Sequence, residues 1–294
     1  MRVAYFTAGT VGAGHLARGV AIERAFDRAG VGVDYRIFSA PLPFSIAHRQ
    51  SVCTIPIAEA ELGDPRRAPE SALARAIASF SPDVLLIDLF WAPVHHLLPI
   101  ARCEAWLLLR SHPARWLIGP ESVPFDRSRF DRIFSIEPQV RVDFAEALCP
   151  IVIANRDELR PRADLRRALD VDDEAHLTLV VHAGQTGEID ALVARARAID
   201  RTTTVRVANL YDEASIFPLA TFFDGADRIV GGAGYNLFWE TRALGLRARS
   251  ALFPFARTID DQARRLRECD AHDPLENGAD RLAALISGGR SPTT

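Results

Sequence analysis

The sequence predicts an α/β fold made of two successive units, each built on a parallel β-sheet. Short apolar runs alternate with longer amphipathic stretches from one end of the chain to the other. Continuous apolar runs are typical of strands covered on both faces, and parallel neighbours need the crossovers that amphipathic helices supply. The alternation stops in the stretch 149–173, which is rich in proline, arginine and aspartate, and then starts again. We therefore expect two α/β domains, residues 1–155 and 156–294, with a last helix that can pack back on the first domain.

Each expected element rests on its own pattern. The run Val84–Ile87 has no polar residue, and Leu16–Arg28 has apolar residues at helical spacing. In the first domain we expect strands at Val3–Phe6, Tyr35–Phe38, Val84–Ile87, Trp106–Leu109 and Arg132–Ile136, and helices at Leu16–Arg28 and Ser71–Phe80. In the second we expect strands at Leu177–Val181, Thr204–Ala208, Arg228–Val230 and Ser250–Phe253, and helices at Ile189–Ile199 and Tyr235–Leu244.

The composition excludes several kinds of chemistry. Of the 294 residues, 35 are basic, and every one of them is arginine. A chain without lysine has no P-loop lysine, no pyridoxal Schiff base and no lysine nucleophile. With 48% hydrophobic residues, 25% charged residues and a net charge of -3, the chain is typical of a soluble globular protein. The charge gives no support to a general nucleic-acid binder.

Cysteine usage and hydropathy indicate a cytoplasmic protein. The four cysteines are scattered, which favours reduced thiols over a disulfide or zinc framework. No apolar run approaches the ~18 residues that a bilayer span needs. Peripheral membrane contact stays open, because Trp106 and the segment Trp116–Ile118 could form an apolar surface, although they also suit the core of the first domain.

A first glycine-rich turn follows the first predicted strand and opens the first predicted helix. Gly12 and Gly14 allow a sharp turn and let a ligand approach the helix N-terminus. Their spacing fits the dinucleotide fingerprint G-x-G-x-x-[GA]. That fingerprint also requires an acid after the second strand, whereas Asp34 stands at the start of that strand. An NAD site is therefore not favoured.

His15 opens this helix, and Asp88 is its candidate partner. The positive end of a helix dipole favours a neutral, proton-accepting imidazole. Asp88 stands at the C-terminal end of a buried strand, which is where ligands bind in open parallel sheets. A carboxylate there could orient the His15 ring and stabilise it as a general base. The alternatives are that His15 only caps or packs on the sheet and that Asp88 only caps a turn.

A second glycine-rich turn occurs in the second domain. The run 227–240 leads from a short strand through Gly232 and Gly234 into a helix that begins with Tyr235 and Asn236. Free amides at such a helix start can bind an anion without lysine. Glu240, further along the helix, could reach sugar or ribose hydroxyls.

Two further segments could contribute polar contacts. The segment 183–187, with Gly184, follows a predicted strand and is expected to line the cleft between the domains as a second phosphate or sugar contact. The neighbours Asp261 and Gln262 place a carboxylate and an amide side by side on a loop, where they could bind adjacent hydroxyls. Taken singly, each is an ordinary surface residue.

In order and spacing, these residues resemble the donor-binding signature of GT-B nucleotide-sugar glycosyltransferases. The likeness is greatest to UDP-glycosyltransferases and to MurG-like bacterial N-acetylglucosaminyltransferases, and it covers most of the chain. It rests on Gly234-Tyr235-Asn236, Glu240, Gly245, Pro254 and Asp261-Gln262, together with the N-terminal turn Gly12–His15 and Asp88. The resemblance implies a GT-B-like fold, in which two Rossmann-like domains with parallel sheets face each other across a cleft.

The resemblance also implies roles. His15, supported by Asp88, would deprotonate an acceptor hydroxyl for attack with inversion. The acceptor would be a small molecule, a lipid or a glycan. A helix N-terminus stabilises a diphosphate leaving group, so neither a metal nor a resident cofactor is required. The resemblance implies a donor that is UDP-linked. Its diphosphate would be bound by the amides of Gly234, Tyr235 and Asn236, its ribose by Glu240, and its sugar by Asp261 and Gln262. Further donor contacts would come from Gly12, Gly14, Gly184 and Gly232.

Two departures from the pattern keep other functions open. Gly232 replaces the family's usual histidine, and Leu237 replaces its usual serine or threonine, so two side-chain contacts to phosphate are missing. A nucleotide-sugar hydrolase or epimerase would use the same cleft without a sugar acceptor. A catalytically silent sugar-nucleotide-binding protein would tolerate the loss of the two contacts.

Overall fold

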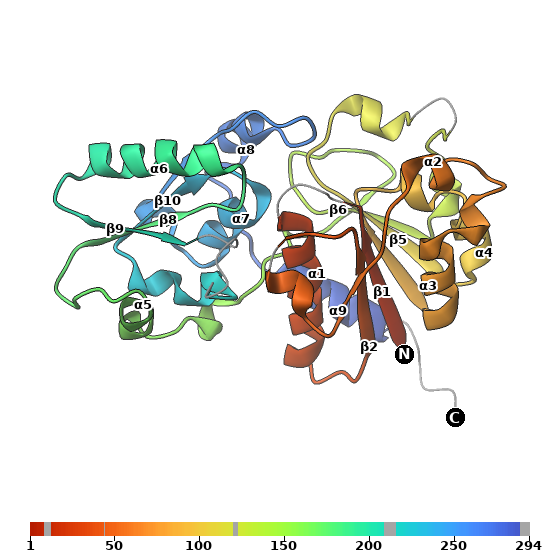
Figure 1. Ribbon diagram of the computed structural model, residues 1–294, viewed down its shortest axis with the longest axis horizontal. Helices are drawn as coiled ribbons and strands as arrows, with labels where there is room; N and C mark the ends of the chain where they lie inside the picture. The colour runs from red at the N-terminus through yellow and green to blue at the C-terminus, as the bar shows by residue number, and fades with distance from the viewer. Residues whose placement is uncertain (9–12, 44, 120–122, 209–215, 289–294) are drawn as a thin grey trace.

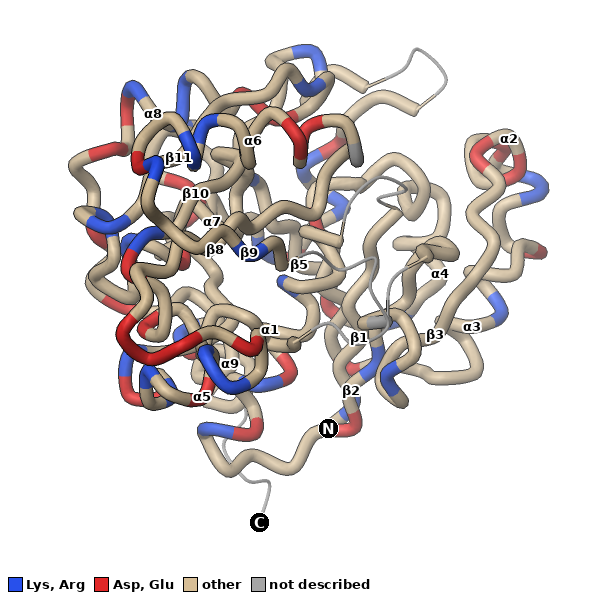
Figure 2. The backbone as a smooth tube through the Cα atoms, turned by 60° about the vertical axis from the view of Figure 1, so that its left-hand side comes forward, with Lys and Arg blue, Asp and Glu red and all other residues tan. Residues whose placement is uncertain are grey.

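In a computed structural model, the described residues form two parallel β-sheets with helices packed against them (Figure 1). These residues are 1–8, 13–43, 45–119, 123–208 and 216–288. The expected α/β class with two parallel sheets is confirmed. Figure 2 shows acidic and basic positions interspersed along the chain rather than gathered on opposite sides, in keeping with the small net charge of -3.

The first sheet has seven parallel strands in the order β3-β2-β1-β4-β5-β6-β7. They are β1 (Arg2–Thr7), β2 (Asp34–Ser39), β3 (Val52–Thr54), β4 (Val84–Asp88), β5 (Glu104–Leu109), β6 (Arg132–Ser135) and β7 (Glu146–Ala147). Because the strands are parallel, the residues that follow β1, β4 and β5 meet at one edge of the sheet.

Both faces of this sheet are covered. Val3 and Tyr5 of β1 belong to the hydrophobic cluster that contains α1, whereas Ala4 and Phe6 belong to the cluster that contains α3. Successive side chains of a strand point to opposite faces, and here both faces are packed. This explains why the central strands read as continuous apolar runs in the sequence.

The second sheet has four parallel strands in the order β11-β10-β8-β9. They are β8 (Leu177–Val181), β9 (Thr204–Ala208), β10 (Arg228–Gly232) and β11 (Ser250–Phe253). Strands β10 and β8 pair so that Gly231 opposes Val181. The glycine turn after β10 therefore lies beside the loop after β8.

Helices connect the strands and cover the sheets. The α-helices are α1 (Gly14–Arg28), α2 (Glu59–Leu62), α3 (Ala72–Phe80), α4 (Leu98–Ala101), α5 (Arg162–Ala168), α6 (Thr186–Ile199), α7 (Tyr235–Ala243), α8 (Gln262–Cys269) and α9 (Gly278–Gly288). The predicted strands and helices agree with this structure to within a few residues at their ends. The edge strands β3 and β7 were not predicted, because a run of two or three residues carries almost no periodicity.

The last helix, α9, follows the second sheet in sequence but packs on α1, a helix that covers the first sheet (Figure 1). Arg28 on α1 donates from Nε to Oδ1 of Asp280 on α9, at 2.9 Å. At the start of α9, Asn277 accepts a hydrogen bond from the amide of Val152, at 3.2 Å. The C-terminal segment therefore ties the two halves of the chain together.

The start of α9 tolerates no side chain at Gly278. A Cβ atom there would lie 1.9 Å from the carbonyl oxygen of Cys149, a backbone atom that cannot swing away. We expect Gly278→Ala to lower the free energy of unfolding by about 1–3 kcal/mol, the usual cost of overpacking, as measured by urea denaturation. The control is Gly288→Ala on the same helix, where no atom lies within 4 Å of the added Cβ. Equal stability of the two variants would contradict this close contact.

Candidate active site

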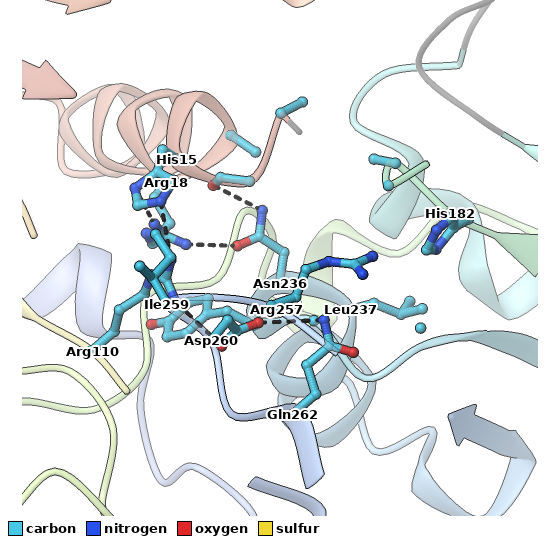
Figure 3. A pocket seen from close by; sticks show the side chains of 18 of the residues that line it. His15, Arg18, Arg110, His182, Asn236, Leu237, Arg257, Ile259, Asp260 and Gln262 are labelled. Atoms are coloured by element: carbon cyan, nitrogen blue, oxygen red, sulfur yellow. Dashed lines mark hydrogen bonds and ion pairs between the residues drawn. The ribbon is translucent and has the colours of Figure 1, made fainter. Parts of the chain in front are cut away.

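One cavity of about 1430 Å³ lies between the two sheets, where the C-terminal ends of their strands meet. The first sheet contributes residues that follow β1, β4 and β5, and the second contributes residues that follow β8, β10 and β11. Ligand sites commonly measure ~300–1,000 Å³. This cavity is therefore large enough for two ligands side by side. Figure 3 shows the side chains that face it from both halves.

The structure brings His15 and Asp88 together on the first-sheet side of the cavity. His15 Nδ1 lies 2.8 Å from Asp88 Oδ2, and both side chains are buried. The same carboxylate oxygen accepts hydrogen bonds from the Tyr5 hydroxyl and from Arg18, whose Nε and Nη2 lie at 3.0 and 2.7 Å. Tyr5 and Arg18 were not predicted from the sequence. Because Arg18 stands one turn after His15 on α1, helical spacing alone could have placed Arg18 beside His15.

The surrounding charges fix the protonation of this pair. Burial would raise the pKa of Asp88, but the Arg18 guanidinium and His15 hold that pKa well below its usual range. Burial lowers the pKa of His15 to about 4, with Asp88 raising that pKa and Arg18 and Arg110 lowering it. His15 is therefore neutral at physiological pH. Nδ1 of His15 lies 2.8 Å from both Asp88 Oδ2 and Arg18 Nη2. In the tautomer whose Nδ1–H donates to the ionised Asp88, Nε2 is the acceptor that faces Arg110.

Arg110 covers Nε2 of His15 and was not predicted as a site residue. Its Nη2 lies 3.1 Å from His15 Nε2, and its Nη1 lies 3.2 Å from Asp260 Oδ1 across the cavity. Arg110 is buried, and its Nε has no hydrogen-bond partner among the described residues. The sequence did hold a signal, because Arg110 directly follows the apolar run of β5 at the same sheet edge as Asp88. In this arrangement Arg110 occupies the position from which a hydroxyl would donate to His15.

We expect Arg110→Gln to raise the pKa of His15, because the substitution removes a nearby positive charge. NMR titration of the His15 ring measures this without requiring turnover. Since a general base must be neutral, the acid limb of any pH–rate profile should move to higher pH in the same variant. The control is Arg115→Gln, which lies in the same cavity lining but is not among the main causes of the shifted pKa of His15. An unmoved titration would show that Arg110 does not control the base.

The second glycine turn lies opposite, at the start of α7. Gly232 ends β10 and Gly234 is the residue before the helix, so the amides of Tyr235, Asn236 and Leu237 have no partner within α7. The Tyr235 side chain is buried, and its hydroxyl accepts a hydrogen bond from the amide of Ile151, at 2.8 Å. Only the backbone amide of Tyr235 is therefore left to make the phosphate contact expected of this residue.

Asn236 links the two sides of the cavity. Its Nδ2 donates to the carbonyl of Gly14 at 3.1 Å, and its Oδ1 accepts from Nη1 of Arg18 at 3.3 Å (Figure 3). The starts of α1 and α7 therefore lie in direct contact. Gly12, also predicted to bind the donor, lies outside the described residues.

Glu240 faces the cavity without a side-chain partner among the described residues, and it is half-buried. Burial raises its pKa to about 7. A desolvated carboxylate without a donor loses the hydrogen bonds that water would supply. Such a group is placed to accept hydrogen bonds from ligand hydroxyls.

Of the predicted pair Asp261 and Gln262, only Gln262 lines the cavity. Gln262 is buried, lines the cavity and accepts from the amide of Phe255 at 3.0 Å. Asp261 is exposed and caps α8, with its carboxylate accepting from the amide of Arg264 at 2.8 Å. The cavity is instead lined by Asp260, one residue earlier. The sequence gives no means of choosing between two adjacent aspartates, because the choice depends on where the helix begins.

Gly184 lies in the cavity lining beside a histidine that was not predicted. A Cβ at Gly184 would lie 2.5 Å from Nε2 of His182 and 2.7 Å from Oε2 of Glu188. These two atoms are themselves 2.6 Å apart. Arg257, also in the lining, donates from Nη1 to Oε1 of Glu188 at 2.7 Å.

Over the residues that the structure describes, no group of three or more His, Cys, Asp or Glu side chains is placed to hold a metal ion. Within the same ranges, no helix is both long and apolar enough to cross a bilayer.

No protein-family model matches the chain, and no curated protein matches it in sequence. Solved structures match nearly all of it. The spinosyn forosaminyltransferase SpnP has 12% identity and a TM-score of 0.59 over 98% of this chain and 91% of its own. The spinosyn rhamnosyltransferase SpnG, complexed with thymidine diphosphate, has 15% identity and a TM-score of 0.54 over 98% and 92%. A putative UDP-N-acetylglucosamine 2-epimerase from Listeria monocytogenes has 11% identity and a TM-score of 0.56 over 100% and 97%.

At identities this low, the likeness establishes the fold. The GT-B-like architecture that the sequence resemblance implied is confirmed.

Proposed function

We propose that this protein is a glycosyltransferase that moves a sugar from a nucleotide-diphosphate sugar to an acceptor hydroxyl. The observation that carries the proposal is that the His15–Asp88 pair and the free amides of α7 face each other across one cavity, joined by Asn236. One side holds a neutral base and the other a site for an anion. Inverting transfer needs these two groups on opposite sides of the reacting carbon.

In this proposal the donor lies mainly on the second-sheet side. The amides of Tyr235, Asn236 and Leu237 hold the diphosphate, which is the leaving group. Glu240 accepts hydrogen bonds from the ribose, and Gln262 with Asp260 contacts the transferred sugar. The donor is expected to be UDP-linked, although thymidine diphosphate bound to SpnG gives reason to test a thymidine-linked donor as well.

The acceptor approaches from the first-sheet side. His15 Nε2 takes the proton of the attacking hydroxyl, and the ionised Asp88 stabilises the imidazolium that forms. The acceptor must displace Arg110 from Nε2. These steps need no metal ion, and independence from metals remains a prediction that transfer in the presence of a chelator would test.

A thermal-shift screen against nucleotides and sugar nucleotides tests the donor site directly. Binding to the folded state raises the midpoint of unfolding by mass action. We expect at least one uridine- or thymidine-linked sugar nucleotide to raise it, with the matching nucleoside raising it less. A screen in which no sugar nucleotide has any effect would contradict the proposed function.

A sugar-nucleotide hydrolase or epimerase is a second candidate. Arg110 over His15 Nε2 favours the epimerase, because epimerisation within the nucleotide needs no attacking hydroxyl or water in that position. The likeness to a putative 2-epimerase is consistent with it at the level of fold. Release of free sugar, or a changed sugar configuration within the nucleotide, would identify these reactions.

A further inference from the structure

A second charged cluster lies in the same cavity and has no part in the roles proposed above. It consists of His182 directly after β8, Glu188 in the first turn of α6 and Arg257 after β11. Glu188 contacts both of the other side chains: Oε2 lies 2.6 Å from His182 Nε2, and Oε1 lies 2.7 Å from Arg257 Nη1. One carboxylate thus fixes an imidazole and a guanidinium at the wall of the cavity.

His182 has an unused nitrogen. The residue is 8% exposed and lines the cavity, and its Nδ1 makes no hydrogen bond to any residue that the structure describes. Nδ1 is open to the cavity rather than sealed inside the protein, so a ligand atom can reach it there.

Register places this nitrogen beside the glycine turn of α7. Gly231 opposes Val181 in the pairing of β10 with β8, so the next residues along, Gly232 and His182, are neighbours. A Cβ on Gly232 would lie 3.1 Å from Nδ1 of His182. Figure 3 shows Arg257 on the same side of the cavity, between Asn236 and His182. The cluster and the free amides of α7 therefore face one volume.

We propose that His182 and Arg257 bind the diphosphate of the sugar nucleotide, and that His182 takes up a proton as it binds. The proposal rests on the sugar-nucleotide role of the cavity. Because Glu188 accepts from Nε2, Nδ1 can donate to a phosphate oxygen only when the imidazole is cationic. A cationic His182 and Arg257 against one Glu188 leave a single positive charge, which offsets part of the negative charge of a diphosphate.

The charges around His182 support this proton uptake. Burial lowers the pKa of His182, Glu188 on α6 raises it, and Arg257 lowers it again. From β10 and the loop after β11, the described neighbours are Gly232 and the Phe255 ring, which carry no charge. The free imidazole is therefore mostly neutral at pH 7.5, and the negative charge of a bound diphosphate raises its affinity for a proton. The contribution of His182 to donor affinity then falls as pH rises.

Titration calorimetry at pH 7.5 in two buffers of different ionisation enthalpy tests the proposal. The probes are UDP-glucose and dTDP-glucose, whose diphosphate esters have no titration near neutrality, with uridine and thymidine as the matching nucleosides. The variants are His182→Ala, His182→Gln and Arg257→Ala. Because Glu240 is expected to lose a proton on binding, the decisive quantity is the difference in proton count between wild type and variant.

The matched controls are a histidine and an arginine of the same half of the chain that lie outside the cavity lining. His176→Ala removes a histidine at the opposite end of β8, where Nδ1 lies 3.3 Å from Asp200. Arg195→Ala removes an α6 arginine that stacks over the Phe253 ring. Neither control should change sugar-nucleotide affinity or proton count.

We expect His182→Ala and Arg257→Ala to weaken sugar-nucleotide binding at least tenfold, with nucleoside binding unchanged. Both His182 variants should take up fewer protons per sugar nucleotide than the wild type, by up to one. The glutamine variant keeps a side chain against Glu188 and covers the case in which the alanine variant does not fold. Wild-type affinity and proton count in folded His182 variants would overturn the inference and leave the proposed function standing. A wild-type protein that binds neither sugar nucleotide would instead overturn the donor-binding part of the proposed function for those donors.

Discussion

His15→Ala is expected to lower sugar transfer by about 10²–10⁴-fold, the usual contribution of a general base, while sugar-nucleotide affinity stays nearly unchanged. The physical reason is the position of the side chain. His15 lies against Asp88 on the first-sheet side, whereas the amides and Glu240 that are proposed to hold the donor belong to α7. Turnover is measured as release of nucleoside diphosphate, and affinity by calorimetry.

The matched control is His48→Ala, an exposed histidine of the first half that lies outside the cavity lining. It should transfer sugar at the wild-type rate. If His15→Ala also turns over at that rate, His15 is not the base. If His15→Ala loses donor binding as strongly as turnover, the division of the cavity into a donor side and an acceptor side is wrong.

Glu240→Gln is expected to stabilise the free protein while weakening donor binding. The pKa of Glu240 is raised to about 7, so the folded state favours the protonated form relative to the unfolded chain. Stability is therefore lost as pH rises from the unfolded pKa near 4.5 to the folded value, and it stays lost above that. A neutral amide removes this cost, by an amount on the order of 1–3 kcal/mol at pH 8 and nothing at pH 4. Urea denaturation at the two pH values measures it.

The same substitution removes an ionised acceptor for ribose hydroxyls. We expect sugar-nucleotide affinity to fall about tenfold at pH 8, in line with the strength of hydrogen bonds to charged groups. In the wild type, affinity should rise with pH through about 7 as Glu240 ionises, and this limb should be absent in the glutamine variant. An affinity that is unaltered by the substitution at pH 8 would remove the ribose role, whatever its effect on stability.

Much of this fold could be predicted from the sequence, because the strands of the first sheet are covered on both faces and therefore read as uninterrupted apolar runs. The run Val84–Asp88 is fully buried, and the Asp88 carboxylate lies at its C-terminal end, as the sequence predicted. The meeting of His15 with Asp88 followed from a general property of parallel sheets, whose carboxyl ends share one edge.

The parts that could not be predicted depend on register and helix boundaries. The contact of Arg110 with Asp260 and the position of His182 beside Gly232 arise only when two sheets or two strands are brought together. Asp260 lines the cavity and Asp261 does not because α8 begins at Gln262, and sequence patterns place helix ends poorly. Single charged residues at strand ends carry no periodicity that would identify a partner on the other sheet.

Proton NMR of the reaction tests directly whether this cavity transfers sugar from a nucleotide to an acceptor with inversion. An α-linked sugar nucleotide is incubated with the protein and a panel of hydroxyl acceptors, and the anomeric signal of the product is followed. An inverting glycosyltransferase would release nucleoside diphosphate only when an acceptor is present and would give a product with the β configuration. A product that retains the α configuration, or release that proceeds equally without any acceptor, would contradict inverting transfer to an acceptor.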